Sequence, residues 1–476
     1  MKAVVTSQAM ARADHHTIHR LGIPGSDLME RAATACTDVL AQQLKPNDKV
    51  TVCCGPGNNG GDGFAIARQL HEQSVAVSVI SVAAADRIRG DAAKHYQRLL
   101  QCGCPVQHIS RDFELSSDTT WIVDALLGTG LTSAVREPYD SIIAAINQHP
   151  ARVLAVDLPS GLCGDDGVVR GLCVHADITV TFEAMKFAHV ITPASLLCGQ
   201  VHLCPIGIRF DETPTTYAVS ASDYHRAPRA VDGHKGSFGT LGVLGGFAGL
   251  EGAASLTALA ALRFGAGKVR ILCDQPQSAR FSQPSVMTGH VQDLGDYSAL
   301  VFGPGLSRTQ RAQELTEKLD LPDIPVVWDA DALFFLNSRT RSLGRVAVIT
   351  PHPGEAAHLL GCSTAEVQAD RLSALRDLRD RFPHSFVVLK GYRTLVATPH
   401  GDTYVNLTGN SALATAGSGD VLAGMIGAML AQSESPDDAV LMSIIRHGMA
   451  ADHWVTAHPD HAMIAEDIMS DLTRFT

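Results

Sequence analysis

The sequence predicts two α/β domains, each built around a mainly parallel β-sheet. Its 476 residues exceed what one hydrophobic core normally supports, because cores stop growing at about 250–300 residues. In both halves, short apolar runs alternate with helical segments, which is the pattern of successive βαβ units. A polar, proline-containing stretch over residues 211–232 interrupts this alternation. We therefore expect one domain over residues 1–215 and a second over residues 225–476.

The first half contains five apolar runs of strand length. They are Val50–Cys54, Val75–Val82, Trp121–Ala125, Val153–Val156 and Ile178–Phe182. The first, third and fourth are each followed at once by a loop rich in Gly, Asn, Asp or Ser. Ligands of open α/β sheets bind beyond the carboxyl ends of the strands, so these loops are expected to converge on one crevice.

The second half repeats the alternation without convincing similarity to the first, which indicates a fusion of two different domains. Its predicted strands are Thr240–Gly245, Val269–Cys273, Ala299–Phe302, Val326–Asp329, Val346–Ile349 and Phe386–Leu389. A helix is expected over Gly252–Gly265, directly after the first of these strands.

Composition excludes several classes of protein. A formal net charge of -11 argues against a nucleic-acid binder, which needs clustered Lys and Arg to neutralise phosphates. The eleven cysteines show no recurrent zinc-ligand spacing, so we interpret them as reduced thiols. Neither a signal peptide nor an apolar run of about 18 residues is present. These features predict a cytoplasmic protein without a membrane partner.

The first loop that can bind a ligand is CGPGNNGGDGFAIARQL, from Cys54 to Leu70. Glycines between a strand and a helix let backbone N–H groups approach a phosphate, and Asn58, Asn59 and Asp62 add polar side chains. The segment matches neither a Walker loop nor the GxGxxG spacing. A tight turn with a helix cap is the structural alternative.

Two further polar loops follow buried strands. They are DALLGTGL, Asp124–Leu131, and VDLPSGL, Val156–Leu162. Asp157 and Ser160 stand where a strand ends, so the Asp157 carboxylate can be partly desolvated and tuned for proton transfer. Each acid alone could be a helix cap, but three polar strand ends in register favour a site.

PGNNGGDG, DALLGTGL, VDLPSG and the later TFEAMKFAH resemble, in this order, the YjeF N-terminal family of NAD(P)H-hydrate epimerases. The resemblance covers residues 1–210 and implies a Rossmann-like three-layer αβα fold. It also implies a set of residues that bind the hydrated NADH or NADPH. These are Asn58, Asn59, Gly60, Gly61, Asp62, Gly128, Thr129, Gly130, Leu131, Thr132, Ser133, Ala134 and Asp157.

The same resemblance implies a potassium ion held by Asn59, Asp124 and Ser160, all of which offer the oxygen atoms that a hard cation prefers. The reaction inverts the hydroxyl-bearing carbon of the reduced nicotinamide ring, so protons must move at that hydroxyl. We expect Asp157 to be the acid/base and Lys186 a polarising partner. The alternative for Lys186 is a solvated surface lysine.

Several loops of the second half also follow strands. HKGSFGTLGVLGG (His234–Gly246) and GPGLS (Gly303–Ser307) are glycine turns, Asp329 and Asp331 end a third strand, and TPHPGE (Thr350–Glu355) follows a fourth. His352 could hydrogen-bond a ligand or be a satisfied structural histidine. KGYRT, Lys390–Thr394, places basic side chains and backbone amides where a nucleotide could bind.

TAGSGDVLAGMIGAML, Thr415–Leu430, is the strongest motif of the second half. GSGD opens a long apolar helix, so the N–H groups of Gly417, Ser418 and Gly419 are expected to face an anion, with Asp420 beside it. A role for Asp420 as a mere N-cap is the alternative, although an N-cap does not explain the GSG that precedes it.

This arrangement resembles the ribokinase-like αβα kinases. With HKGSFG, GAGKVR, GPGLS, TPHPGE and NSALATAGSGDVLAG it is similar, more narrowly, to the ADP/ATP-dependent NAD(P)H-hydrate dehydratases, over residues 227–476. The resemblance implies hydrate-binding and nucleotide-binding residues. For the hydrate they are Ala253, Gly305, His352 and Asp420, and for the nucleotide Lys390, Gly391, Tyr392, Arg393, Thr394, Gly417, Ser418 and Gly419.

The resemblance also implies ADP as co-substrate, with Mg²⁺, because bacterial fused members use ADP. Asp420 would deprotonate the hydroxyl during phosphoryl transfer, and elimination of phosphate would regenerate the cofactor. The chain departs from the family at Asn410–Leu413, where Asn-Pro-Gly-Met is usual. The departure alters the backbone freedom of this turn and puts fine substrate positioning in question.

Two other functions stay open at this point. The second half could be a vitamin-precursor kinase of the same fold that stops at the phosphoester. The first half could be a non-catalytic binding module, although Asn59, Asp124 and Asp157 are all present and the charge is acidic. By resemblance alone we also expect a homo-oligomer whose partners are small molecules.

Overall fold

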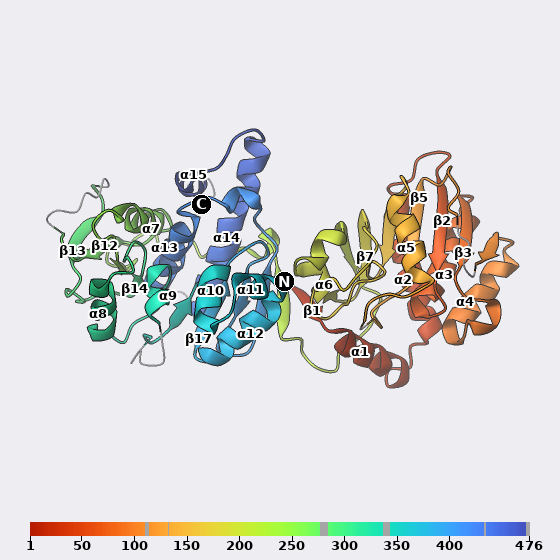
Figure 1. The fold of residues 1–476 in the computed structure, drawn as a ribbon, viewed down its shortest axis with the longest axis horizontal. Helices are drawn as coiled ribbons and strands as arrows, with labels where there is room; N and C mark the ends of the chain where they lie inside the picture. Colours follow the sequence, from red (N-terminus) through yellow and green to blue (C-terminus); the bar gives the residue numbers. More distant parts are fainter. Residues whose placement is uncertain (110–113, 132, 277–283, 337–342, 433–434, 473–476) are drawn as a thin grey trace. The chain divides into compact units, whose positions relative to one another are not determined.

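The computed structural model describes residues 1–109, 114–131, 133–276, 284–336, 343–432 and 435–472. The chain divides into two compact units, Lys2–Thr216 and Tyr217–Thr476, with Met1 assigned to the second (Figure 1). The division falls inside the polar stretch at which the βαβ alternation of the sequence breaks. Each unit is described by itself.

The N-terminal unit is built on a seven-stranded sheet whose strand pairings are all parallel, in the order β4-β3-β2-β5-β6-β7-β9. The strands are β2 (Lys49–Cys54), β3 (Ala76–Ser81), β4 (Val106–His108), β5 (Trp121–Ala125), β6 (Arg152–Val156), β7 (Ile178–Phe182) and β9 (Gln200–Cys204). All five predicted strands of this half are confirmed to within one residue at each end. β1 (Lys2–Val5), which pairs with β8 (Met185–Lys186), has no counterpart in the sequence prediction.

Helices cover both faces of this sheet. They are α1 (Ser7–His19), α2 (Gly25–Ala41), α3 (Asn58–Glu72), α4 (Gly90–Gln101), α5 (Tyr139–Gln148) and α6 (Phe187–Val190), with the 3₁₀ turns η1 (Ala85–Arg87) and η2 (Ala194–Leu197). Successive strand residues point to opposite faces. Cys54 accordingly packs into the core under α2 and α3, while its neighbour Cys53 packs with Ile142 and Ile146 of α5. The result is the predicted three-layer αβα arrangement.

The C-terminal unit repeats this architecture on a larger sheet. Its order β13-β12-β11-β14-β15-β16-β17 is parallel, and β18 and β19 continue it antiparallel towards β10. The strands are β10 (Thr216–Val219), β11 (Thr240–Leu244), β12 (Lys268–Cys273), β13 (Met287–His290), β14 (Ala299–Phe302), β15 (Val326–Trp328), β16 (Ala347–Ile349), β17 (Ser385–Leu389), β18 (Leu395–Ala397) and β19 (Thr403–Asn406). The six predicted strands and the predicted helix are confirmed, whereas β10 lies in the stretch expected to lack regular structure.

The helices of this unit include α13 (Ser418–Ala431), which buries 11 of its 14 residues, and α14 (Pro436–Ala457), which buries 12 of its 22. The others are α7 (Glu251–Arg263), α8 (Gln310–Lys318), α9 (Asp331–Phe335), α10 (Pro353–Leu360), α11 (Thr364–Ala369), α12 (Arg371–Arg381) and α15 (Ala465–Asp471), with η3 (Ala221–Asp223) and η4 (Ser411–Leu413). α13 and α14 lie in the main core with α7. A helix apolar on all sides is expected only inside a core, so the start of α13 is held rigidly.

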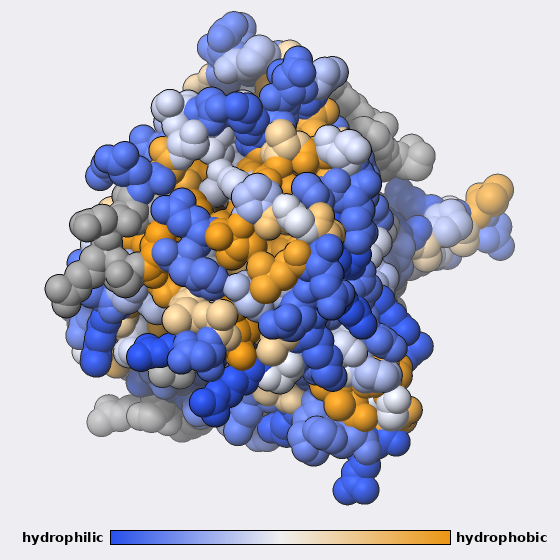
Figure 2. Space-filling model, turned by 90° about the vertical axis from the view of Figure 1, so that its right-hand side faces the viewer, coloured by the Kyte–Doolittle hydropathy of each residue, from blue (hydrophilic) through white to orange (hydrophobic). Residues whose placement is uncertain are grey.

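The surface of the protein is mainly hydrophilic where Figure 2 shows it. Figure 2 shows hydrophilic residues over most of the face that it presents, with hydrophobic residues gathered between them near the middle. None of the helices in the described ranges combines the length and the apolar character needed to cross a membrane.

Candidate active sites

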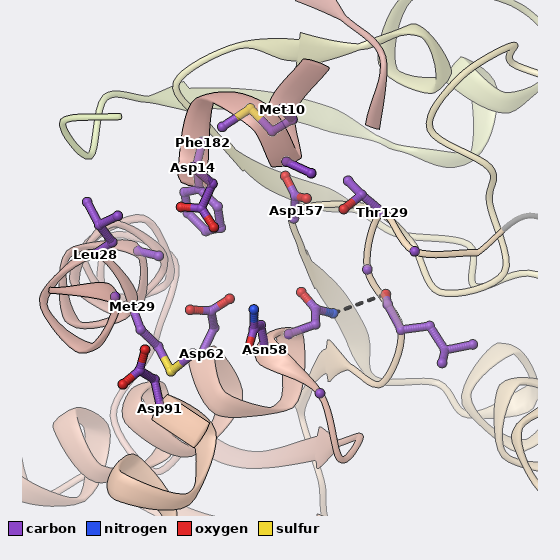
Figure 3. Close-up of a pocket in the computed structure, with 18 of the residues that line it drawn as sticks. Met10, Asp14, Leu28, Met29, Asn58, Asp62, Asp91, Thr129, Asp157 and Phe182 are labelled. Atoms are coloured by element: carbon purple, nitrogen blue, oxygen red, sulfur yellow. Dashed lines mark hydrogen bonds between the residues drawn. The ribbon is translucent and has the colours of Figure 1, made fainter. Parts of the chain in front are cut away.

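The N-terminal unit contains a cavity of about 600 Å³ at the carboxyl ends of β2, β5 and β6. Asn58, Asn59 and Asp62 reach it from the start of α3, and Asp157 from the end of β6 (Figure 3). The loop Gly128–Leu131 after β5 forms another wall. Convergence of the strand-end loops on one crevice, as expected for an open α/β sheet, is therefore confirmed.

Four of the residues that the sequence implied for the hydrate do not line this cavity. Gly60 and Gly61 are buried within the first turn of α3, while Ser133 and Ala134 are exposed beyond the cavity wall. Thr132 lies outside the described residues. A Cβ at Gly60 would lie 1.8 Å from the carbonyl oxygen of Gly55. Backbone packing, and not ligand contact, is therefore what requires glycine at position 60.

Asp157 and Lys186 form a buried ion pair at the cavity. The Lys186 Nζ lies 2.5 Å from Asp157 Oδ1 and 3.0 Å from Thr181 Oγ1, and its side chain is 1% exposed. The Thr181 hydroxyl also donates to Asp157 Oδ1 at 2.8 Å. Burial raises the pKa of Asp157, but the Lys186 ammonium and these hydrogen bonds outweigh it and hold the pKa below its usual value. The alternative of a solvated Lys186 is wrong.

The opposite wall of the cavity is acidic without a lysine partner. Asp62 faces the cavity from α3 and Asp14 from α1 (Figure 3). Burial, followed by the charges of Asp157 and Asp14, raises the pKa of Asp62 well above its usual value. Burial and Asp91 likewise raise the pKa of Asp14. Sequence reasoning missed Asp14, because a single acid on an amphipathic helix looks like a solvated residue.

Asp124 and Ser160 lie beneath the cavity floor and are buried. The Ser160 hydroxyl donates to Asp124 Oδ1 at 2.6 Å, and the Ser160 amide donates to Oδ2 at 2.7 Å. Asn59 binds the neighbouring carbonyl of Leu127 through Nδ2 at 3.1 Å. Burial raises the pKa of Asp124 to about 6, and none of the groups that bond to it in the described structure is a cation. Such a buried carboxylate fits a bound monovalent cation.

The second site of the chain lies at the start of α13. Gly417 precedes the helix with φ 88°, and a Cβ there would lie 2.5 Å from the Leu256 side chain, so only glycine fits. Asp420 is the third residue of the helix, and no side chain caps this end. The alternative of Asp420 as an N-cap is therefore wrong. The Ser418 amide bonds the Thr415 carbonyl at 3.4 Å, which leaves the amides around it to face a ligand.

Lys390 connects this helix start with two further carboxylates. Its Nζ lies 2.6 Å from Asp329 Oδ1 and 3.7 Å from Glu355 Oε2. It also lies 3.3 Å from where a Cβ on Gly419 would stand. Burial, then the charge of Asp329, raises the pKa of Asp420 to about 7, although Lys390 opposes this. Burial also raises the pKa of Glu355 to about 7.

The two basic side chains of the KGYRT segment bond to other groups of the protein. Lys390 turns to Asp329, and the Arg393 guanidinium donates to the Leu407 carbonyl at 3.1 Å. Tyr392 is 46% exposed, with the Arg393 guanidinium 5.1 Å from its ring centre. Among the described residues, the amides of Gly391, Arg393 and Thr394 donate to no other protein group.

The residues implied for the hydrate lie on loops that pack together. The Gly305 carbonyl accepts from the Phe247 amide at 2.8 Å, just before α7 with Ala253. His352 caps α10 by accepting from the amides of Gly354 and Glu355, so it has a structural role. Its pKa is lowered by burial and by the charge of Lys390, which places it beside the Lys390 cluster.

The unusual turn after Asn410 is closed by side chains. Asn410 Oδ1 accepts from the Ala412 amide at 2.9 Å, and its Nδ2 donates to Asp452 at 2.9 Å. Ser411–Leu413 forms the 3₁₀ turn η4. The Leu413 carbonyl accepts from the Ser418 hydroxyl at 2.9 Å, so this turn supports the start of α13 without proline or glycine.

Comparison with known proteins identifies a family for each half of the chain. Residues 25–188 match the family model described as YjeF-related protein N-terminus, and residues 241–474 match that of NAD(P)H-hydrate dehydratase. Bifunctional NAD(P)H-hydrate repair enzymes of Coxiella burnetii and Escherichia coli are 36% and 35% identical to the chain. The alignments cover 95% and 97% of this chain, and 95% and 92% of the relatives.

Among solved structures, the ADP/ATP-dependent NAD(P)H-hydrate dehydratase of Bacillus subtilis is 34% identical, with a TM-score of 0.46. It covers 52% of this chain and 92% of its own. The two bifunctional relatives align with almost the whole chain and are more than one-third identical to it, and this decides the family to which it belongs. The chain belongs to the family of bifunctional NAD(P)H-hydrate repair enzymes.

Proposed function

We propose that this chain repairs hydrated NADH and NADPH in two reactions. The N-terminal unit, corresponding to the predicted domain 1–215, interconverts the two epimers of the hydrate. The C-terminal unit, corresponding to 225–476, dehydrates one epimer at the expense of ADP. The observation that carries the proposal is the presence, in one chain, of the Asp157–Lys186 pair in an open cavity and of Asp420 at the glycine-rich start of α13.

In the epimerase reaction, we assign the acid/base role to Asp157 and a polarising role to Lys186. Lys186 keeps Asp157 ionised and able to accept a proton from the hydroxyl of the hydrate. Asp62 faces the same cavity, and its raised pKa favours the protonated form that can donate. When the surroundings of two carboxyl groups lower the pKa of one and raise that of the other, the first can act as the base and the second as the acid of the same site.

The hydrate would bind between the start of α3 and the loop after β5. Asn58, Asn59, Asp62 and Gly128–Leu131 line this part of the cavity, and first-turn amides of α3 suit a diphosphate. For Gly60, Gly61, Ser133 and Ala134 we propose a supporting role, because they lie outside the cavity wall.

In the dehydratase reaction, Asp420 would take the proton from the hydroxyl while its oxygen attacks the β-phosphorus of ADP. The bond from that phosphorus to the bridging oxygen breaks, and AMP leaves. The resulting phosphate ester then loses inorganic phosphate from one ring carbon and a proton from the next, which restores the double bond. The amides of Gly417 and Gly419 would stabilise charge on the transferred group, with Ala253, Gly305 and His352 holding the hydrate. The Ser418 amide, expected from the sequence to join them, instead bonds the Thr415 carbonyl.

The nucleotide would bind the segment Lys390–Thr394, next to the start of α13. Mg²⁺ takes most of its ligands from phosphates and water and needs only one or two carboxylates. Glu355, whose Oε2 lies 3.7 Å from the Lys390 Nζ, is suitably placed to be one of them. The ion would neutralise negative charge on the phosphates.

Potassium is expected to accelerate epimerisation. Ser160 is hydrogen-bonded to the buried Asp124 carboxylate, and Asn59 and Ser160 both donate to the Leu127 carbonyl in the loop that follows β5. A cation bound by Asn59, Asp124 and Ser160 would order this loop. Replacing K⁺ by Li⁺ at constant ionic strength should lower the epimerisation rate several-fold, while Asp124→Asn should lose the difference between the two ions. An equal rate in both ions would exclude this role.

The dehydratase should show an acid limb near neutral pH. Only ionised Asp420 accepts a proton, and its pKa is raised to about 7. The maximal rate should therefore fall about tenfold for each unit below about pH 6. Epimerisation, which relies on Asp157 with a lowered pKa, should stay nearly constant over the same range. A flat dehydratase profile from about pH 8 to about pH 5.5 would contradict the assignment of Asp420 as base.

The experiment that tests the proposed function follows the near-ultraviolet absorbance of the reduced nicotinamide ring. Purified protein, ADP and Mg²⁺ are added to a mixture of both epimers of hydrated NADPH. We expect complete recovery of NADPH with one AMP and one phosphate released per cofactor. A stable phosphoester without phosphate release would indicate a vitamin-precursor kinase type of reaction, which the full-length relatives do not support.

The remaining expectations concern the setting of the enzyme. We propose that it acts in the cytoplasm, where reduced nicotinamide cofactors and ADP are both available, and that it forms a homo-oligomer, as the family resemblance implies. Size-exclusion chromatography with light scattering measures the second point directly.

A further inference from the structure

Arg371 is a buried arginine in an unfavourable position. It is the first residue of α12 and only 3% exposed. Within the described residues no carboxylate pairs with it, and burial lowers its pKa to about 10. Arginine is almost never fully buried unless it is paired, and a cation in the first turn of a helix opposes the helix dipole. Burial without an ion-pair partner and an unfavourable helix-dipole interaction both destabilise the fold, and residues with such costs are typical of functional sites.

The guanidinium of Arg371 binds carbonyl groups of a single loop. Its Nη2 donates to the carbonyls of Leu389 at 3.2 Å and Lys390 at 3.3 Å. Its Nη1 donates to the carbonyls of Tyr392 and, at 3.3 Å, Arg393. Four terminal N–H groups thus meet four carbonyl groups. Lysine has three donors on one nitrogen and cannot reproduce this fork.

These hydrogen bonds also fix the direction of the amides in the loop. In a planar trans peptide the C=O and the following N–H point to opposite sides. Holding the carbonyls of residues 390, 392 and 393 therefore turns the N–H groups of Gly391, Arg393 and Thr394 away from Arg371. Among the described residues, none of these three amides donates to another protein group. They form a row of donors that a ligand can use.

This row of donors lies next to the candidate phosphoryl-transfer site. Lys390, at the start of the loop, contacts Asp329 and approaches Gly419 of α13. Gly391 has φ 138°, and a Cβ there would lie 3.0 Å from Arg371 Nη2. Glycine at position 391 therefore leaves room for the Arg371 guanidinium against the loop.

We propose that Arg371 is a positioning residue for the nucleotide: it holds the carbonyls of loop 389–393 on one side, so that the amides of Gly391, Arg393 and Thr394 bind acceptor atoms of a nucleoside diphosphate. The inference rests on the proposed function, in which this loop binds ADP. Arg371 itself does not touch the nucleotide.

The test compares Arg371→Lys with Arg376→Lys, an equivalent change at an exposed position of the same helix. In the full-length protein, Arg371→Lys should raise the KM for ADP about ten- to a hundredfold, corresponding to one or two lost hydrogen bonds. The KM for the hydrate and the rate at saturating ADP should stay within about twofold. Arg376→Lys should change none of these values. In Arg371→Ala, millimolar guanidinium should partly restore the KM for ADP.

Two results would overturn the inference. One is an unchanged KM for ADP in Arg371→Lys. The other is a parallel loss of kcat, of both KM values and of thermal stability, without rescue by guanidinium, which would make Arg371 a purely structural residue. A wild-type protein that regenerates no NADPH with ADP would instead contradict the proposed function.

Discussion

Replacing Asp420 by asparagine is expected to lower the rate of ADP-dependent dehydration by about a hundred- to ten-thousandfold, the usual contribution of a positioned general base. Asparagine keeps the size of the side chain but cannot accept the proton of the hydroxyl. The amides at the start of α13 remain, so binding of ADP should change little. The measurement is the initial rate of NADPH formation from the substrate epimer at saturating ADP.

The same variant should be more stable than the wild type above neutral pH. Burial and Asp329 raise the pKa of folded Asp420 to about 7, so the folded state binds its proton more tightly than the unfolded state. Ionisation of Asp420 therefore destabilises the fold progressively as pH rises from its unfolded value towards the folded pKa and stays unfavourable above it. Asparagine removes this effect, and the unfolding temperature should rise by a few degrees.

Asp438→Asn is the matched control, because Asp438 is likewise the third residue of a helix, α14, but lies outside the site. This variant should keep full dehydratase activity. An Asp420→Asn enzyme that retains more than about a tenth of the wild-type rate would remove Asp420 from the role of base.

Replacing Asp157 by asparagine is expected to stop enzymatic epimerisation while dehydration continues. A mixture of both epimers should then recover only to the share of the epimer that the dehydratase accepts, followed by slow spontaneous interconversion. The reason is that Asp157 is the carboxylate that Lys186 holds ionised at the cavity. The measurement is the amplitude of NADPH recovery together with the rate of the slow phase, which should be at least about a hundredfold below that of the wild type.

Loss of the Asp157 charge also leaves Lys186 buried without its ion-pair partner, so stability must be measured in parallel. The double variant Asp157→Asn with Lys186→Met removes both charges and separates the two effects. It should regain stability without regaining epimerisation. Asp86→Asn, at an exposed position of η1, should behave as the wild type. Complete and rapid recovery in Asp157→Asn would exclude Asp157 as the acid/base.

The two sites share one arrangement, in which a buried lysine forms an ion pair with one carboxylate near a second one. In the N-terminal unit, Lys186 binds Asp157 and leaves Asp62 with a raised pKa. In the C-terminal unit, Lys390 binds Asp329 and leaves Asp420 with a pKa of about 7. In both units burial is the main cause of the raised pKa, of Asp62 in one and of Asp420 in the other.

The sequence by itself determined the elements and the strand-end loops. Eleven predicted strands were confirmed because apolar runs of strand length, bounded by glycine and polar residues, are local signals. Asp157, Asp124 and Asp420 could be selected for the same reason. Asp157 directly follows β6, Asp124 is the last residue but one of β5, and Asp420 lies in the first turn of α13. The roles of individual site residues stay predictions.

Only the tertiary structure decided which side chains meet. The pairing of Lys186 with Asp157 and of Lys390 with Asp329 joins residues 29 and 61 positions apart, and no local pattern encodes such contacts. Asp14 and Arg371 look like solvated helix residues in the sequence, yet one lines the cavity and the other is buried beneath a loop. Burial and charge proximity are properties of the packed chain, and these set the pKa values and amide directions on which both reactions depend.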